Sequence, residues 1–455
     1  MLSPDRDPRV DRGARQRARG GAACARGRRR GSGPACGAFG ARERRSPRRP
    51  SISASAARSG AGRPGERTGN RKSMDASQVG ADRNGHRVQG EAMGAHRARE
   101  RQDAHAALSL HSIQYLRAVA ALMVVMLHLG LQWQRLGYAG PWPGWLAGGV
   151  DIFFVISGLI MWITTADRPM TATDFYARRL IRIAPLYWLL TAATVAIMLV
   201  APHAIQSSHF DVWHVVASFL FLPSINTVTG QIEPVLIPGW TLNYEMLFYV
   251  VFGLSLRWRA PWRLASCALL LGAPIVWHAW TGQGHGVWLF YTSDAMLEFV
   301  LGMMLGWMYL RGGLRWGRLA GWGLIVCGVI ALAYFGGLGY ARLPSMGVPA
   351  FAIVAGALTL ERARAVPRWR ALHALGDASY SLYLSHPIVL SASEQLWRHG
   401  VVQNGTLARL AFSVFALTLT IAAAWICYRG LEQPLTRFLN RRLRPLIVSR
   451  SVASS

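Results

Sequence analysis

The chain has 455 residues, of which 52% are hydrophobic and 16% charged, with a formal net charge of +28. Apolar runs long enough to cross a hydrocarbon core of ~30 Å recur between residues 112 and 428. This pattern excludes a soluble globular domain and predicts an all-α polytopic integral membrane protein. The five cysteines show neither metal-ligand spacing nor a disulfide framework, so no metal is expected.

Residues 1–105 differ from the rest of the chain. They hold half of the Lys and Arg residues and no periodic apolar pattern, which predicts a disordered Arg-rich tail. A second expectation is that part of this tail is an over-extended gene start, with Met74 or Met93 as the true beginning. A basic arm that binds anionic lipid or nucleic acid is the functional alternative, but the only aromatic residue there is Phe39, and no nucleic-acid partner is expected.

The apolar runs predict about ten transmembrane helices within a membrane domain at 109–440, followed by a basic cytoplasmic tail at 441–455. The shorter run 212–223 ends at Pro223 and is expected to be re-entrant or interfacial. The ten expected spans are 112–132, 146–166, 183–201, 240–256, 264–280, 288–310, 319–337, 346–361, 378–397 and 406–428.

Arginine alternates between the connecting loops, which predicts the orientation. The loops 167–182, 257–263, 311–318 and 362–377 and the C-terminal end are rich in arginine. The intervening loops carry only Arg135, Arg342 and Arg398. Because cytoplasmic loops collect Arg and Lys, both termini are expected in the cytoplasm. The positive charge of the membrane domain therefore indicates topology rather than nucleic-acid binding.

The first span contains two ionisable residues, Arg117 and His128. Eleven residues at 100° each bring them to within 20° of one helix face, about 16 Å apart along the axis. A charge at bilayer depth costs at least ~2.5 kcal/mol, so such groups mark functional sites by default. The structural alternatives are a snorkelling arginine and a histidine bonded to a neighbouring helix. For the aligned pair, function is favoured.

The next two spans begin with charged residues. Asp151 lies near the outer end of the second span, where it could orient an imidazole or simply stabilise a helix N-terminus. Arg178, Arg179 and Arg182 stand at the entrance of the third. Guanidinium groups suit a phosphate-bearing ligand, although arginines at this place also serve as topology anchors.

Three later motifs carry further candidates. Glu245 lies inside the fourth span and needs a cation or proton partner, for which His128 and Arg117 are available. In "GDASYSLYLSHP", Tyr380, Tyr383 and His386 share one broad face. Hydroxyl bonding between helices is the alternative to catalysis for the tyrosines. The last candidate is Glu432, in "GLEQP" at the cytoplasmic end of the final span.

Six motifs in order resemble the membrane-bound acyltransferase-3 family over about residues 109–440. They are "QYLRAVAALMVVMLH", "GVDIFFVISG", "FYARRLIRIAPLYW", "WTLNYEMLFY", "GDASYSLYLSH" and "LEQP". The first two are most similar to the branch that acetylates bacterial exopolysaccharides. The disordered N-terminal tail departs from the family pattern and supports the over-extended gene start.

The resemblance implies an O-acetyltransferase that moves an acyl group, with acetyl expected, from acetyl-CoA to a hydroxyl of a carbohydrate, free or lipid-linked. It implies essential roles for His128, Arg117, Arg178 and Arg182. In the expected mechanism the arginines hold the donor, His128 is the general base, and Glu245 or Asp151 orients its other nitrogen. Direct transfer and a relay through an acyl-histidine both stay open.

Two other function classes remain. A transporter or polymerase of lipid-linked glycans predicts movement or joining of glycans without acetyl-CoA. A non-catalytic membrane scaffold predicts that substitution of Arg117 and His128 is tolerated.

Overall fold

The computed structural model describes residues 110–138, 140–166, 170–201, 210–284, 286–400 and 405–453. These all belong to one compact unit, Ser77–Ser455. The expectation for the tail at 1–105 lies outside the described residues. Side chains are described except for 399–400 and 444–453.

The described part is helical, and its only strand-like pairing is the isolated bridge between Ile225 and Ile232. The α-helices are α2 (His111–Arg135), α3 (Gly148–Thr165), α4 (Ala172–Val200), α5 (Val212–Phe219), α6 (Trp240–Ser255), α7 (Ala260–Thr281), α8 (Val287–Tyr291), α9 (Met296–Leu310), α10 (Gly317–Phe335), α11 (Val348–Arg362), α12 (Arg370–Asp377), α13 (Ser379–Gly400), α14 (Thr406–Cys427) and α15 (Gln433–Ala453). Short helical turns are η1 (Gly144–Ala147), η3 (Ile237–Gly239), η4 (Leu343–Gly347) and η5 (Tyr428–Glu432).

Within the described residues, eight helical segments are long and apolar enough to cross a membrane. They are His111–Arg135, Gly144–Thr165, Ala172–Val200, Ala260–Thr281, Val287–Leu310, Gly317–Phe335, Leu343–Arg362 and Thr406–Leu443. The polytopic all-α fold is thereby confirmed. The other two expected spans are also helices, but α6 has only 16 residues and α13 is rich in serine and carries Glu394 and Arg398. The run at 212–223 forms α5, whose eight residues are too few to cross.

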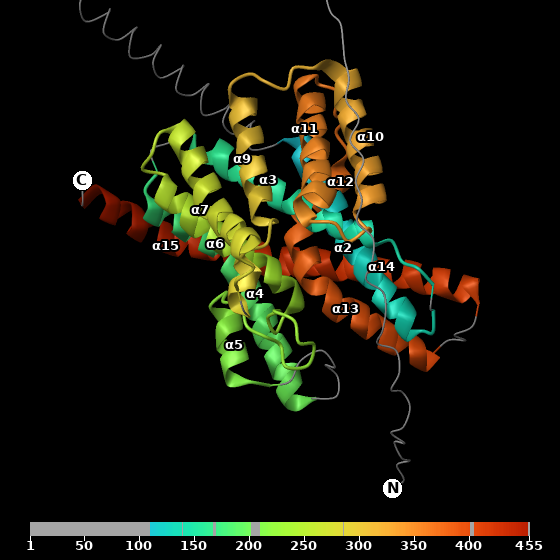
Figure 1. Ribbon diagram of the computed structural model, residues 1–455. Helices are drawn as coiled ribbons and strands as arrows, with labels where there is room; N and C mark the ends of the chain where they lie inside the picture. Colours follow the sequence, from blue (N-terminus) through green and yellow to red (C-terminus); the bar gives the residue numbers. More distant parts are fainter. Residues whose placement is uncertain are drawn as a thin grey trace, which may run out of the picture. The chain divides into compact units, whose positions relative to one another are not determined.

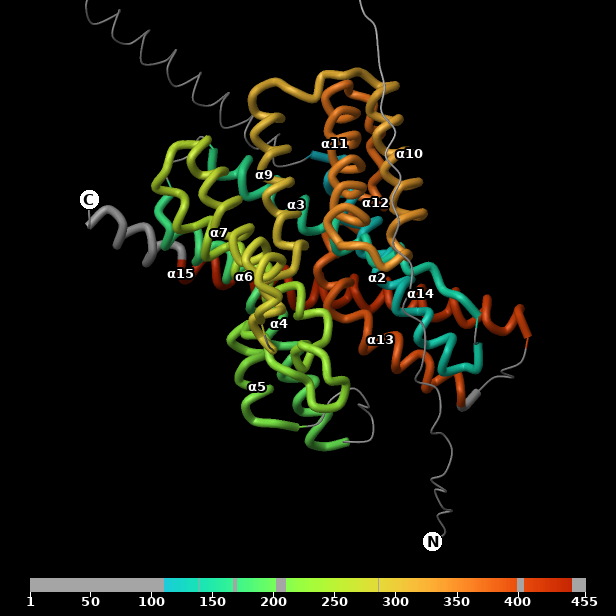
Figure 2. Tube along the Cα trace, viewed as in Figure 1, coloured from blue at the N-terminus to red at the C-terminus, as the bar shows by residue number. Residues whose placement is uncertain are grey.

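Helix α3 packs against α2, α9 and α11, while α10 lies along α11 and α13 along α14 (Figures 1 and 2). The contact between α3 and α9 is made by backbone. A Cβ atom on Gly158 would overlap the carbonyl oxygen of Phe299, and one on Gly302 would overlap that of Val155. Small residues allow such close approach of membrane helices. Helix α3, which forms one wall of the site described below, is therefore supported on its other side by close backbone contact with α9.

Helix α4 begins well before the apolar run that predicted it. The Thr171 hydroxyl accepts the backbone N–H of Asp174 at 3.1 Å, which caps a helix starting at Ala172 rather than at residue 183. Arg178, Arg179 and Arg182 consequently belong to the body of the helix. Their side chains are held by a helix that packs on α6 and α13, not by a loop.

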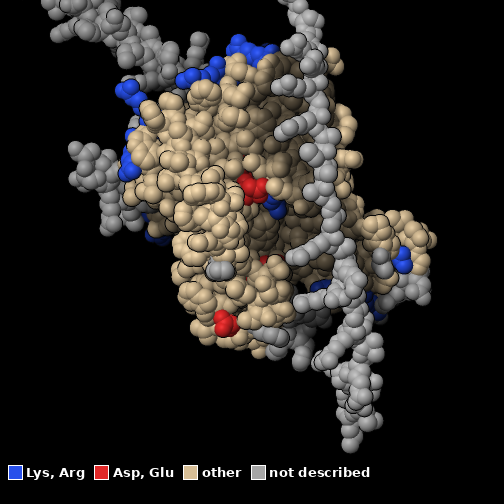
Figure 3. Space-filling view, in the orientation of Figure 1, with Lys and Arg blue, Asp and Glu red and all other residues tan. Residues whose placement is uncertain are grey.

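The three arginines of the otherwise Arg-poor loops are all tied to neighbouring groups. Arg342 makes a salt bridge to Asp151, and Arg398 makes one to Glu394. Arg398 also donates to the carbonyl of Arg135 at 2.7 Å. Figure 3 shows basic side chains along the upper and left edges of this face and a few more toward its lower right. Few charged side chains lie between them, as a lipid-facing surface requires.

Candidate functional site

A cavity of about 310 Å³ lies between helices α2, α3, α4, α6 and α13. Its walls are mainly apolar, and Phe153 from α3 packs against all three of the buried apolar clusters of the bundle. We call it the arginine cavity. The charged and hydroxyl-bearing residues that line it are Arg117, Ser157, Arg179, Arg182, Thr241, Glu245, Tyr249, Ser379, Tyr380 and Tyr383.

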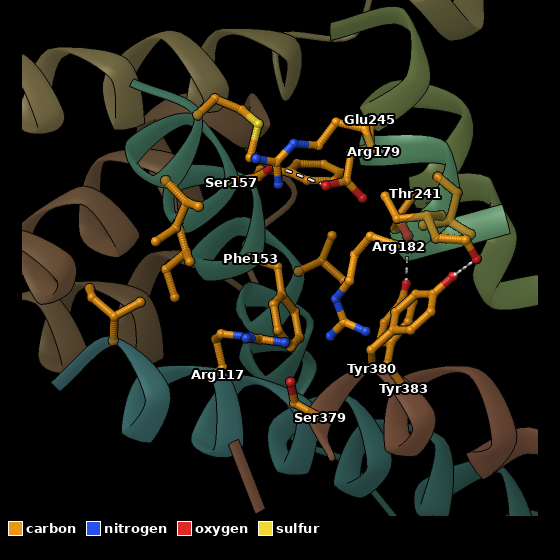
Figure 4. Close-up of a pocket in the computed structure, with 18 of the residues that line it drawn as sticks. Arg117, Phe153, Ser157, Arg179, Arg182, Thr241, Glu245, Ser379, Tyr380 and Tyr383 are labelled. Atoms are coloured by element: carbon orange, nitrogen blue, oxygen red, sulfur yellow. Dashed lines mark hydrogen bonds between the residues drawn. The ribbon is translucent and has the colours of Figure 1, made fainter. Parts of the chain in front are cut away.

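Three guanidinium groups converge on this cavity from two helices. Figure 4 shows Arg117 entering from α2 and Arg182 pointing toward the centre, with Arg179 beside Glu245. Arg182 is ion-paired with Glu432 and lies 5.6 Å from the Tyr380 ring centroid. Against these three guanidinium groups stand two carboxylates, Glu245 in the lining and Glu432 in the ion pair with Arg182.

Two of the guanidinium groups have no carboxylate partner among the described residues. Arg117 donates only to the amide oxygen of Gln114, at 3.2 Å. Arg179 lies 5.7 Å from the ring centroid of Phe175, and its Nε is buried without a hydrogen-bond partner. A buried cation normally has an anionic partner, so this arrangement favours binding of an anion.

Glu245 is held by hydroxyl groups rather than by a direct ion pair. It accepts a hydrogen bond from Ser157 Oγ at 2.9 Å and another from the Tyr249 hydroxyl. The expected cation partners, Arg117 and His128, make no salt bridge with it in the described part of the chain. Ser157 is a lining residue that the sequence did not single out.

The two tyrosines of α13 join helices through their hydroxyl groups. Tyr380 donates to the carbonyl of Ile183 at 2.7 Å, and Tyr383 bonds Thr241 Oγ1 at 2.9 Å and the carbonyl of Pro238 at 3.2 Å. This is the geometry of the structural alternative, although both phenol groups also line the cavity.

Glu432 lies behind the cavity rather than within its lining. Besides its ion pair with Arg182, it accepts a hydrogen bond from Ser381 Oγ at 2.5 Å. Arg178 is likewise not among the residues that line the cavity, so Arg179 takes the place expected for it beside Arg182.

His128 does not line the cavity either; its neighbour is His386, with ring centroids 4.8 Å apart. We call these two residues the histidine pair. Tyr383 connects the histidine pair to the arginine cavity. Its ring lies 6.0 Å from that of His386 and 5.8 Å from that of Phe153, and both Tyr383 and Phe153 line the cavity. The prediction that Glu245 or Asp151 orients one ring nitrogen of His128 is wrong. The Nδ1 atom of His128 instead bonds the backbone carbonyl of Val124 at 2.9 Å.

Asp151 belongs to a different site, in which it pairs with Arg342. Arg342 Nε and Nη2 each lie 2.9 Å from an oxygen of Asp151, and Nε lies 4.0 Å from Glu298. Asp294 is next to them and accepts the backbone N–H of Leu343 at 2.7 Å. We call these four residues the carboxylate cluster. Asp151 therefore cannot orient His128.

Two features of the sequence point to this cluster. Arg342 is one of three arginines on loops that lack arginine otherwise, so a fixed partner could have been expected for it. Glu298 also falls inside the expected span 288–310, where an ionisable residue calls for a partner. No group of three or more His, Cys, Asp or Glu residues suited to a metal ion occurs among the residues that the structure describes.

Comparison with known proteins identifies the family of this chain. A model described as "Acyltransferase domain" matches residues 110–429. The "Exopolysaccharide production protein ExoZ" of Rhizobium meliloti (strain 1021) is 39% identical over 298 residues, covering 64% of this chain and 90% of that protein. "Nodulation protein 10" of Rhizobium leguminosarum bv. viciae is 25% identical over 386 residues, covering 77% and 98%. No solved structure matches. The chain belongs to the acyltransferase-3 family of membrane proteins.

Proposed function

We propose that this protein is an O-acetyltransferase that moves an acetyl group from acetyl-CoA to a hydroxyl of a cell-surface or exported carbohydrate such as an exopolysaccharide. Family membership supports acyl transfer, and the relationship to the R. meliloti protein supports a carbohydrate acceptor. The observation that carries the proposal is the arginine cavity, in which two guanidinium groups lack a carboxylate partner.

The donor fits the charge of the arginine cavity. Coenzyme A carries phosphate groups, and guanidinium groups bind phosphate through paired N–H donors. Arg117, Arg179 and Arg182 would bind the donor, while the apolar walls receive the uncharged pantetheine arm and acetyl group. Glu432 fixes the direction of Arg182 through their ion pair.

His128 would act as the general base. Its Nδ1 bonds a backbone carbonyl, so the proton sits there and Nε2 has a free lone pair. Nε2 takes the proton of the sugar hydroxyl, the oxygen forms a bond to the acetyl carbon, and the carbon–sulfur bond breaks. The thiolate then recovers the proton from His128, so the reaction balances without a further reactant. In the relay alternative, Nε2 itself carries the acetyl group before the sugar does.

The orientation supports a donor from the cytosol and an acceptor from the other side. The arginine-rich loops would be cytoplasmic, with both termini, and Arg117 lies nearer that side than His128. The two residues are about 16 Å apart along α2, so an extended acyl-carrying arm would run beside this helix from one to the other. This arrangement would let the membrane domain pass an acetyl group across the bilayer in a bacterial inner membrane.

The test uses the purified protein in lipid vesicles with radiolabelled acetyl-CoA and the exopolysaccharide of the host cell. We expect label in the glycan with the natural chain, and loss of transfer by about 10²-fold or more with His128→Ala. The variant should insert and purify normally. Glycan movement or joining that does not depend on acetyl-CoA would instead support a transporter or polymerase, and full transfer by His128→Ala would remove His128 from the reaction.

A further inference from the structure

The histidine pair joins the first helix to α13. The two ring centroids are 4.8 Å apart and the ring planes are inclined by 58°. His386 is fully buried, and its Nε2 has no hydrogen-bond partner among the described residues. Leaving such a group unpaired costs about 1–3 kcal/mol. The position of this ring therefore needs an explanation beyond packing.

Pro387 provides the reason for the orientation of His386. Proline has no backbone N–H, so in a helix it leaves the carbonyl four residues earlier without its donor. That carbonyl belongs to Tyr383, and the Nδ1 of His386 bonds it at 2.7 Å. The order His-Pro thus fixes the proton of the imidazole on Nδ1 and leaves Nε2 as a lone pair.

His128 has the same arrangement on the facing helix, because its Nδ1 bonds the carbonyl of Val124 at 2.9 Å. Each ring thereby keeps Nε2 free as an acceptor. Val125, Leu129, Leu382 and Leu390 are near the two histidines in sequence and belong to one buried apolar cluster. Within the described part of the chain, no group donates to Nε2 of His386. Two adjacent acceptors in an apolar site can be satisfied together by a single added proton.

We propose that His386 is a positioning residue that stabilises the protonated form of His128 during acyl transfer, through a hydrogen bond between the two Nε2 atoms. This inference rests on the proposed function of His128 as general base. Once the sugar oxygen has become an ester oxygen it is a weak acceptor, and the new N–H of His128 is left to the lone pair of His386. When the thiolate takes the proton, both rings return to their neutral forms.

The same geometry explains how the base works without a carboxylate. In many sites an acidic side chain stabilises the imidazolium, but such a charge would be costly to hold in this apolar cluster. A neutral imidazole performs the task without a permanent charge. Two positively charged rings at this separation would repel strongly, so the pair accepts only one proton beyond the two on the Nδ1 atoms.

The test compares two amide variants that differ by one methylene group and so place the amide at different distances from the backbone. His386→Asn places an amide near Nδ1 and keeps the bond to Tyr383, but it removes the acceptor at Nε2. His386→Gln places an amide oxygen near the position of Nε2. In the vesicle assay we expect Asn to lower kcat by about 100-fold with the KM for acetyl-CoA unchanged, and Gln to recover about a tenth of the natural kcat.

A purely structural role for His386 predicts the opposite order, with Asn tolerated as well as Gln or better, and that order would overturn the inference. A second variant leaves the ring in place. Pro387→Ala supplies a backbone N–H that competes for the Tyr383 carbonyl, so kcat should fall about tenfold, and an unchanged kcat would contradict the role given to Pro387. If the natural chain transfers no acetyl group, the proposed function fails first, independently of these variants.

Discussion

The arginine cavity and the carboxylate cluster are built from the same groups in opposite proportions. In the cavity, guanidinium groups outnumber carboxylates, and two of them have no carboxylate partner. In the cluster, one guanidinium lies among three carboxylates and binds one of them through two nitrogens. The first arrangement leaves positive charge available to a ligand, whereas the second uses all of it to join helices.

This difference separates binding from stability within one membrane domain. The cluster connects α3 to the segment before α11 and to α9, which are far apart in the sequence. Its fully buried acids, Asp151 and Glu298, are 0% exposed, so no soluble ligand reaches them. Substitutions in the cluster should therefore change folding, and substitutions in the cavity should change the reaction.

The largest effect is expected from Arg342→Met. It leaves two buried carboxyl groups without their cation, which should lower the free energy of unfolding by about 3–5 kcal/mol. Unfolding in detergent measures the change. The comparison variant is Arg398→Met, whose guanidinium is 46% exposed and solvated, although its partner Glu394 is 5% exposed, so the loss should be smaller than for Arg342→Met. Equal losses for the two variants would show that the cluster does not stabilise the fold.

Arg117→Met should come next. Methionine keeps most of the volume but removes the charge and the donors, so kcat/KM for acetyl-CoA should fall about 100-fold, or ~2.7 kcal/mol. Stability should change little, because this arginine has no carboxylate partner. Steady-state kinetics gives the first value and detergent unfolding the second. Arg318→Met, at an exposed position in the first turn of α10, is the control with unchanged kinetics. A large loss of stability with normal kinetics would reverse our assignment of the cavity.

The smallest effect is expected from Glu245→Gln, and its direction is the informative part. Glutamine keeps the acceptor for Ser157 but removes a negative charge near the phosphate-binding arginines. Binding of coenzyme A should tighten about fivefold, or ~1 kcal/mol. Equilibrium binding measures it, with Glu233→Gln in an exposed contact as control. A fall in kcat of more than about 100-fold would instead place Glu245 in the chemical step.

Much of the fold could be predicted from the sequence, because apolar runs in membranes become helices of matching length. The run 112–132 corresponds to α2, at His111–Arg135, with only small differences at the ends. The start of α4 could not be predicted from hydropathy, since its first turns are polar and depend on a cap at Thr171. The apolar runs also did not reveal that α6 has only 16 residues, or that serines, Glu394 and Arg398 make α13 less apolar than the other spans.

The site was predictable where its members lie on one helix or in one motif. The face shared by Arg117 and His128 follows from helical geometry alone. Partners that come from distant segments could not be assigned, because periodicity contains no information on which helices meet. Asp151 and Arg342 are 191 positions apart, and nothing in either segment indicates the other. The same limit explains why a carboxylate was expected beside His128 instead of the imidazole of His386.

The separation between Asp151 and Arg342 has a consequence for how the protein is made. A ribosome adds about 5–20 residues per second, so roughly 10–40 s pass between synthesis of the acid and arrival of its partner. During this interval the first helices wait in the membrane with an unsatisfied carboxyl group. The salt bridge can form only after the segment before α11 has been synthesised, so α3 cannot reach its final electrostatic environment earlier.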